Sequence, residues 1–115
     1  MAVEGDIQTV LGALVANRCY PLIAPQETAS PYIIYQVIST VPETSLDGPT
    51  GTNRRRVQVD VYADTYGAAK VLEQSIGAAM QAADFTNLPL SATDLFESEV
   101  QLYRVTMDFA IWTMI

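Results

Sequence analysis

Histidine is absent from this sequence of 115 residues. Without it the chain lacks the usual general base at neutral pH, the base of serine and cysteine nucleophile pairs, and the commonest zinc ligand. The most familiar hydrolase mechanisms are therefore excluded. The sequence also has no loop with the acidic spacing of a calcium site and no glycine-rich loop with the lysine of a phosphate site. It predicts no catalytic residues, no metal and no cofactor.

Cysteine and long apolar runs are scarce as well. The single cysteine, Cys19, cannot form an internal disulfide and lies in an apolar context, so we expect a small core residue in a protein that folds in the cytosol. The N-terminus is acidic where a signal peptide needs basic residues, and no apolar run approaches the roughly 18 residues of a membrane span. We expect neither export by that route nor a membrane segment.

Positive charge is in short supply, because six basic residues face thirteen acidic ones and leave a net charge of −7. This balance repels a phosphate backbone, so it disfavours sequence-specific binding of nucleic acid. Three of the six cations lie together at Arg54, Arg55 and Arg56. They are either a solvated strand start or a group of guanidinium side chains that pair with carboxylates on another subunit or partner.

Half of the residues are hydrophobic, which at this length predicts one compact domain over residues 1–115. Apolar residues recur every three or four positions over 3–16 and 65–83, the spacing of two amphipathic helices. Residues 41–53 are rich in proline, glycine and small polar side chains. This composition predicts a long exposed loop.

Runs of β-branched and aromatic residues predict four strands, at 32–39, 57–63, 91–99 and 102–112. The first is apolar at nearly every position, as in a central strand covered on both faces, whereas the second and fourth alternate as strands with one face on the core. The order of elements predicts an α+β fold, in which two helices pack on one face of a mostly antiparallel sheet of about four strands.

The opposite face of this sheet would be left without a helix. Six apolar or aromatic residues could project from it: Tyr32, Ile34, Ile38, Tyr62, Leu102 and Trp112. Such a face is more apolar than the surface that a soluble monomer normally exposes. The pattern therefore favours self-association.

Several acidic residues could supply the paired carboxylates of a glycosidase: Asp60, Asp64, Asp94, Glu97, Glu99 and Asp108. Asp60 and Asp108 lie in the middle of strands that could be neighbours. Ion pairs with Arg104 or Arg56 explain these two residues equally well. The alternative function left open is a small α+β enzyme or ligand-binding domain, dimeric, with a pocket lined by tyrosines and by the acids of the last strands.

Two motifs at a fixed separation, Pro-Tyr-Ile-Ile-Tyr-Gln within 30–36 and Arg-Val-Gln-Val-Asp-Val-Tyr within 56–63, resemble the tail completion proteins of long-tailed bacteriophages. Segments 18–21, 24–26 and 103–112 and the helix at 65–83 match the same family in the same order. The resemblance covers nearly the whole chain.

The resemblance implies a structural protein without enzymatic activity, also called a tail terminator or tail-to-head joining protein, in a phage or prophage. Copies would form a ring, typically a hexamer, that caps the head-proximal end of the tail tube and stops its polymerisation. The ring would contact the tail tube protein and a head completion or connector protein, and DNA would pass through it without specific binding. Assembly would take place in the host cytoplasm, and the protein would end in the virion. Another ring component of the same joint, such as a head completion protein, is the third possibility.

Two groups of contact residues follow from these considerations. We expect subunit or tail contacts at six residues: Arg54, Arg55, Arg56, Tyr32, Tyr62 and Trp112. We expect four acids in exposed settings to face the lumen: Glu43, Asp47, Glu97 and Glu99. Carboxylates that line a channel would repel the DNA backbone and keep it from sticking.

Overall fold

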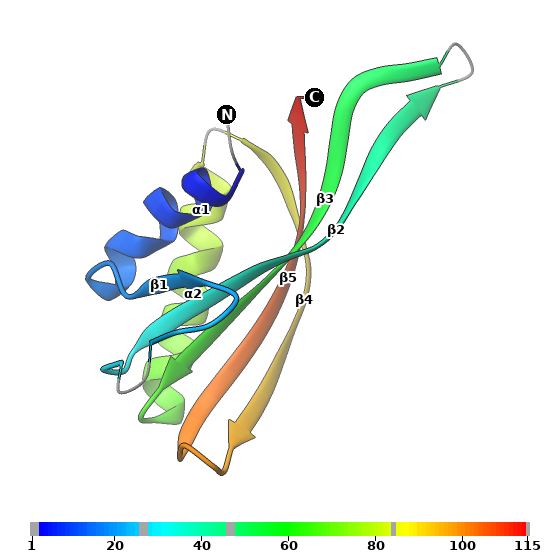
Figure 1. The fold of residues 1–115 in the computed structure, drawn as a ribbon. Coiled ribbons are helices and arrows are strands. Elements are labelled where there is room, and N and C mark those ends of the chain that lie inside the picture. Colours follow the sequence, from blue (N-terminus) through cyan, green and yellow to red (C-terminus); the bar gives the residue numbers. More distant parts are fainter. Residues whose placement is uncertain (1–2, 26–27, 46–47, 84, 115) are drawn as a thin grey trace.

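The structure is a computed structural model that describes residues 3–25, 28–45, 48–83 and 85–114. Two helices lie on one side of a five-stranded sheet, and one hairpin of the sheet projects beyond them (Figure 1). The strand order is β1-β2-β3-β5-β4, and every neighbouring pair is antiparallel except β1 and β2. The predicted α+β class is confirmed, with five strands in place of about four.

Helix α1 spans Val3–Gly12 and continues as a single 3-10 turn, Ala13–Val15. The helix ends where Ala16 and Asn17 adopt the left-handed conformation, with φ of 51° and 64°. Asparagine tolerates this conformation better than most residues, because its short polar side chain can bond locally to the backbone. The helical segment therefore ends at Ala16 and Asn17, where the predicted helix at 3–16 also ends.

Helix α2 spans Tyr66–Ala82 and begins after Thr65, whose hydroxyl accepts a hydrogen bond from the Ala68 amide at 3.1 Å. Ile76 and Met80 are fully buried against the sheet, as the predicted apolar stripe required. The apolar spacing of the sequence predicts Ala68 as the first residue of this buried stripe, but Ala68 is exposed and the stripe begins at Ala69. The predicted first position was wrong by one residue, because Ala68 belongs to the capping turn.

Five strands form the sheet: β1 (Cys19–Pro21), β2 (Tyr32–Ser45), β3 (Gly48–Ala63), β4 (Thr86–Glu97) and β5 (Leu102–Met114). β1 is a three-residue strand that the sequence did not predict. β4 begins five residues before the predicted start at Ser91 and includes Pro89. Proline is tolerated there because β4 is an edge strand and its register shifts directly after Pro89.

The long exposed loop predicted at 41–53 is wrong. β2 and β3 continue through this region, and their ladder pairs Pro42 with Asn53 and Ser45 with Gly48. Beyond Thr52, where β3 last pairs with β5, the described residues show only β2 and β3 in the ladder, so each has a free edge there, and the register shifts between Pro42 and Thr44. We call residues 42–45 and 48–53 the arm; it projects beyond the helices (Figure 1).

The core lies between the helices and one face of the sheet. Alternate residues of β3 and β5 are buried, as predicted: Val57, Val59, Val61, Ala63, Val105, Met107, Phe109 and Ile111. Cys19 is 1% exposed and belongs to this core, also as predicted. β2 is buried only on its helix-facing side, because Ile38 is 41% exposed. The prediction that this strand is covered on both faces was therefore wrong.

Candidate functional site

The sheet face turned away from the helices is called here the open face (Figure 1). The pairing of the strands determines which side chains lie next to each other across this face. At one end Tyr32 of β2 pairs with Tyr62 of β3, which pairs with Arg104 of β5. Towards the other end Arg54 of β3 pairs with Trp112 of β5. The tyrosines and the arginine segment are therefore at opposite ends of one surface.

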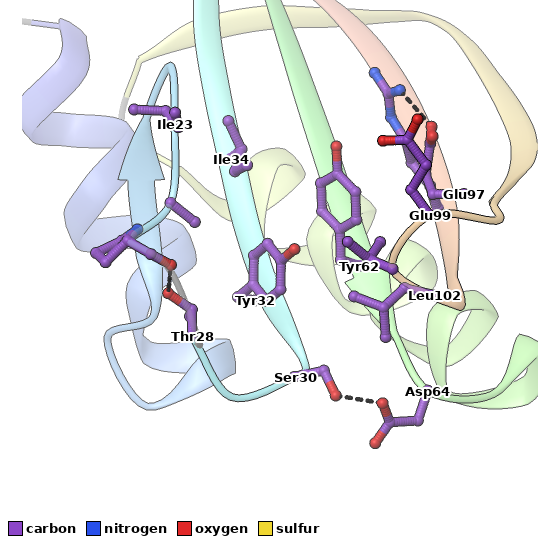
Figure 2. Close-up of a pocket in the computed structure, with 14 residues that line it drawn as sticks. Ile23, Thr28, Ser30, Tyr32, Ile34, Tyr62, Asp64, Glu97, Glu99 and Leu102 are labelled. Carbon is purple, nitrogen blue, oxygen red and sulfur yellow. Dashed lines mark hydrogen bonds and ion pairs between the residues drawn. The ribbon is translucent and has the colours of Figure 1, made fainter.

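An open cleft of about 670 Å³ lies at the tyrosine end of this face. The Tyr32 and Tyr62 rings form its floor and stack with their centres 4.8 Å apart. Ile23 and the residues after β1 lie on one side of the rings, and Glu97 and Glu99 on the other (Figure 2). We call this hollow the tyrosine cleft.

Charge in the tyrosine cleft is mostly negative, because Asp64, Glu97 and Glu99 line it against one guanidinium, Arg104. Arg104 donates a hydrogen bond to Glu97 Oε1 at 2.8 Å, and its guanidinium carbon lies 5.7 Å from the centre of the Tyr62 ring. Burial raises the pKa of Tyr62, so this phenol stays neutral at neutral pH. Asp64 accepts a hydrogen bond from the Ser30 hydroxyl at 2.6 Å (Figure 2).

The middle of the open face is a band of paired polar side chains. Asp60 is 7% exposed and accepts hydrogen bonds from Gln58 Nε2 at 3.0 and 3.2 Å. Its carboxylate lies 3.3 Å from Arg104, and the Asp108 carboxylate lies 2.9 Å from Arg56. The ion pairs that the sequence offered for both carboxylates are therefore confirmed. Each carboxylate has its own cation, as in a structural network.

A second hollow, of about 470 Å³, lies at the other end of the open face. We call it the arginine hollow, and its lining residues are Ser39, Val41, Arg54, Arg55, Arg56, Leu88, Leu90, Ala110 and Trp112. Leu88 and Leu90 are 52% and 50% exposed. Among the described residues that line it, none is acidic. The hollow therefore joins the arginine segment 54–56 to an exposed apolar surface.

The structure gathers the predicted contact residues into two groups. Arg54, Arg55, Arg56 and Trp112 share the arginine hollow, whereas Tyr32 and Tyr62 share the tyrosine cleft with Glu97 and Glu99. The other two predicted lumen acids belong to neither group. Glu43 lies in β2, but its side chain is not described, and Asp47 lies outside the described residues.

Sequence reasoning missed the leucines of the arginine hollow. Leu88 and Leu90 alternate with other residues in the pattern of a strand, but Asn87 and Pro89 favoured a loop. It also missed the role of Asp94, which accepts hydrogen bonds from Tyr66 at 2.8 Å and from Lys70 at 3.1 Å. These bonds lower the pKa of Asp94 and tie β4 to α2.

In the described ranges, no group of three or more cysteine or carboxylate side chains could hold a metal ion. Within the same ranges no helix is long and apolar enough to cross a membrane.

Comparison with known proteins gives a family and a fold. The model of one family, Tail completion protein gp17, matches residues 5–114. No curated protein matches the chain. Among solved structures, a chain from the virion of a native gene transfer agent particle has a TM-score of 0.65 over 99% of this chain and 92% of that one. Its sequence is 17% identical, so this likeness shows a shared fold. The family match covers almost every residue, and the chain therefore belongs to the Tail completion protein gp17 family of phage tail structural proteins.

Proposed function

We propose that this protein caps the head-proximal end of a phage or prophage tail tube as a ring of about six copies. The ring stops polymerisation of the tube and joins the tail to the head, through contacts with the tail tube protein and with a head completion or connector protein. The unit that assembles is the whole chain, residues 1–115, as one domain. Assembly takes place in the host cytoplasm, and the protein then stays in the virion.

The observation that carries this proposal is the open face of the sheet. A ring that closes needs two different surfaces on each copy, because each subunit meets its two neighbours with different patches. The open face supplies a tyrosine cleft and an arginine hollow at its two ends. Four of its exposed apolar residues, Val41, Ile38, Leu88 and Leu90, are between 41% and 52% exposed. Contact with other proteins would remove this surface from water.

Charge supports the passage of DNA through such a ring. The chain has a net charge of −7, so most of its surface repels phosphate groups. A lumen lined by acids such as Glu43 and Asp47 would let DNA move without binding to it. The neighbouring fold comes from a virion particle, which is also where we place this protein.

Two measurements test the proposal together. Native mass spectrometry of the purified protein over a concentration series should give a closed ring of about six copies. Electron microscopy of particles made without the protein should show tails of uncontrolled length that lack heads. Normal tails with normal head joining would overturn the proposal. A label on the protein that appears on the head side of the joint would assign it to a head completion role.

A variant with Glu at 54, 55 and 56 should abolish ring formation or tail attachment. Arg56 pairs with Asp108, so reversing its charge also weakens the sheet. Arg54→Glu changes a single charge, and Arg54 is exposed and lines the arginine hollow. It should keep a cooperative unfolding transition while ring formation or tail attachment is lost.

A further inference from the structure

We propose that the arginine hollow of one copy docks on the tyrosine cleft of a second copy. The contact would bring Arg54 and Trp112 of one chain against Glu99, Tyr32 and Tyr62 of the next. The inference rests on the proposed function, since copies must meet in a ring, and it names the surfaces that meet.

Charge complementarity selects a second copy as the occupant. Three carboxylates and one guanidinium line the tyrosine cleft, whereas Arg54, Arg55 and Arg56 line the arginine hollow with no acidic residue in its described lining, and Arg56 among them is already paired with Asp108. With a net charge of −7, two copies repel each other over most orientations. The orientation that places the cleft against the hollow is the one in which opposite charges meet.

The residues of the two surfaces also fit each other chemically. A guanidinium group binds a carboxylate through two parallel hydrogen bonds and can stack on an aromatic ring. The cleft offers both partners, because the stacked rings of Tyr32 and Tyr62 lie beside the Glu99 carboxylate (Figure 2). Burial raises the pKa of both tyrosines, so neither would compete as an anion. Within its own chain Glu97 is held by Arg104 and Asp64 accepts the Ser30 hydroxyl hydrogen, which leaves Glu99 as the acid that a second copy would meet.

Apolar surface adds to the same contact. In the tyrosine cleft Ile23 and Val100 are 78% and 55% exposed. In the arginine hollow Leu88 and Leu90 are about half exposed. Contact between the two surfaces would bury apolar side chains on both partners, which supplies affinity while the charges select the register. This inference assigns Glu99 to the contact between copies, in place of the lumen position expected from the sequence.

Two opposite charge reversals test the contact. Glu99→Lys alters only the cleft and Arg54→Glu alters only the hollow, and both residues are exposed. Asp6→Lys is the matched control, because it changes the charge as Glu99→Lys does but lies on α1, away from the open face. Self-association of each full chain is measured by sedimentation and native mass spectrometry over a concentration series. Urea unfolding shows whether each variant is folded.

We expect each reversal alone to weaken self-association by at least about tenfold, and the control to leave it unchanged. An equimolar mixture of the two reversed chains should recover association, because each mixed contact again joins opposite charges. Loss in both single variants without recovery in the mixture would overturn the inference, as would wild-type association in both. A wild-type chain that stays monomeric at every concentration would overturn it too.

The mass of the wild-type assembly separates this inference from the proposed function. Recovery in the mixture with a wild-type assembly that stops at two copies would support the docking contact and overturn the ring. A ring whose mass neither reversal changes would support the proposed function and overturn the docking contact. If either folded variant forms normal rings but fails to join tails, its surface meets a different protein, and the docking contact is overturned.

Discussion

At the scale of single residues, Asp60 shows how the open face combines polar chemistry with rigidity. Among the described residues it is the one buried charged side chain, and its carboxylate is satisfied by Gln58 and Arg104. A buried carboxylate with several hydrogen bonds is costly to alter, because its partners are then left without an acceptor. Its place in the network is structural, between the two hollows of the open face.

We expect Asp60→Asn to lower the free energy of unfolding by about 1–3 kcal/mol, because the half-buried Arg104 loses one of its two carboxylates. Urea denaturation measures the change. Glu99→Gln is the control, since Glu99 is exposed and should change stability by less than about 0.5 kcal/mol. Equal stability of the Asp60→Asn and wild-type proteins would contradict this account of the network.

The buried thiol of Cys19 makes the stability of the protein depend on pH. Burial raises the pKa of its thiol from the usual 9.0 to about 11. In the unfolded chain the thiol ionises at lower pH, so ionisation favours the unfolded state between about pH 9 and about pH 11. The contribution of Cys19 to stability is complete below this window and is lost across it. Urea denaturation at several pH values should show wild-type stability falling more steeply there than that of Cys19→Ala. The tyrosines titrate alike in both proteins, so parallel curves would refute the role of burial.

At the scale of elements, α2 depends on its first turn. Thr65 caps the helix through its hydroxyl, which accepts the Ala68 amide hydrogen. Thr65→Ala should lower the free energy of unfolding by about 1 kcal/mol, because a terminal amide loses its partner. Thr65→Ser keeps the hydroxyl and should stay close to wild type in the same thermal or urea unfolding measurement. Equal losses in both variants would show that the threonine methyl group matters more than the cap.

The arm is the element that adds reach to the molecule. The principal extents of the whole molecule are 51 × 25 × 23 Å, and its radius of gyration of 14.9 Å exceeds the roughly 13 Å of a compact chain of this length. An extension of this kind is suited to contact with another protein, because the core lies elsewhere between the helices and the sheet.

Replacing residues 43–52 by Asn-Gly joins the paired residues Pro42 and Asn53 through a tight hairpin turn. The core residues of β2 and β3 remain, so the melting temperature should shift by less than about 4 °C. Under the proposed function the shortened protein should fail to join tails to heads. Electron microscopy of tails assembled with it is the measurement, and normal joining would show that the arm is dispensable.

At the scale of the whole molecule, contacts between copies should depend on salt. The chain is strongly acidic, and the proposed docking contact joins exposed opposite charges. Raising the ionic strength from about 0.05 M to about 0.5 M shortens the screening length severalfold and should weaken self-association. Sedimentation at both salt concentrations measures this. Stronger association at high salt would indicate that apolar burial outweighs charge pairing, since screening also relieves the general repulsion.

Particular residues show where prediction from sequence succeeded. Alternation in β3 and β5 identified the buried face, because successive strand residues point to opposite sides and Val57 to Ala63 repeat apolar side chains at every second position. The ion-pair partners of Asp60 and Asp108 could also be predicted from the sequence, because the neighbouring strands contain only a few cationic residues. The prediction of a loop at 41–53 was wrong because composition reports only the local preference of the chain. The two prolines of this region are tolerated in strands because the two-stranded arm keeps free edges.

The sequence by itself determined the α+β class, the alternating core, the buried Cys19 and the family, because these depend on local periodicity and on the order of motifs. Only the tertiary structure decided which side chains share a surface. Arg54 is paired with Trp112 across β3 and β5, and the Tyr32 ring stacks on the Tyr62 ring across β2 and β3, although these residues are far apart in the chain. Strand register is set by the packing of the whole sheet against its helices, and a shift of one residue would turn every side chain to the opposite face. The two hollows of the open face therefore exist only in the folded molecule.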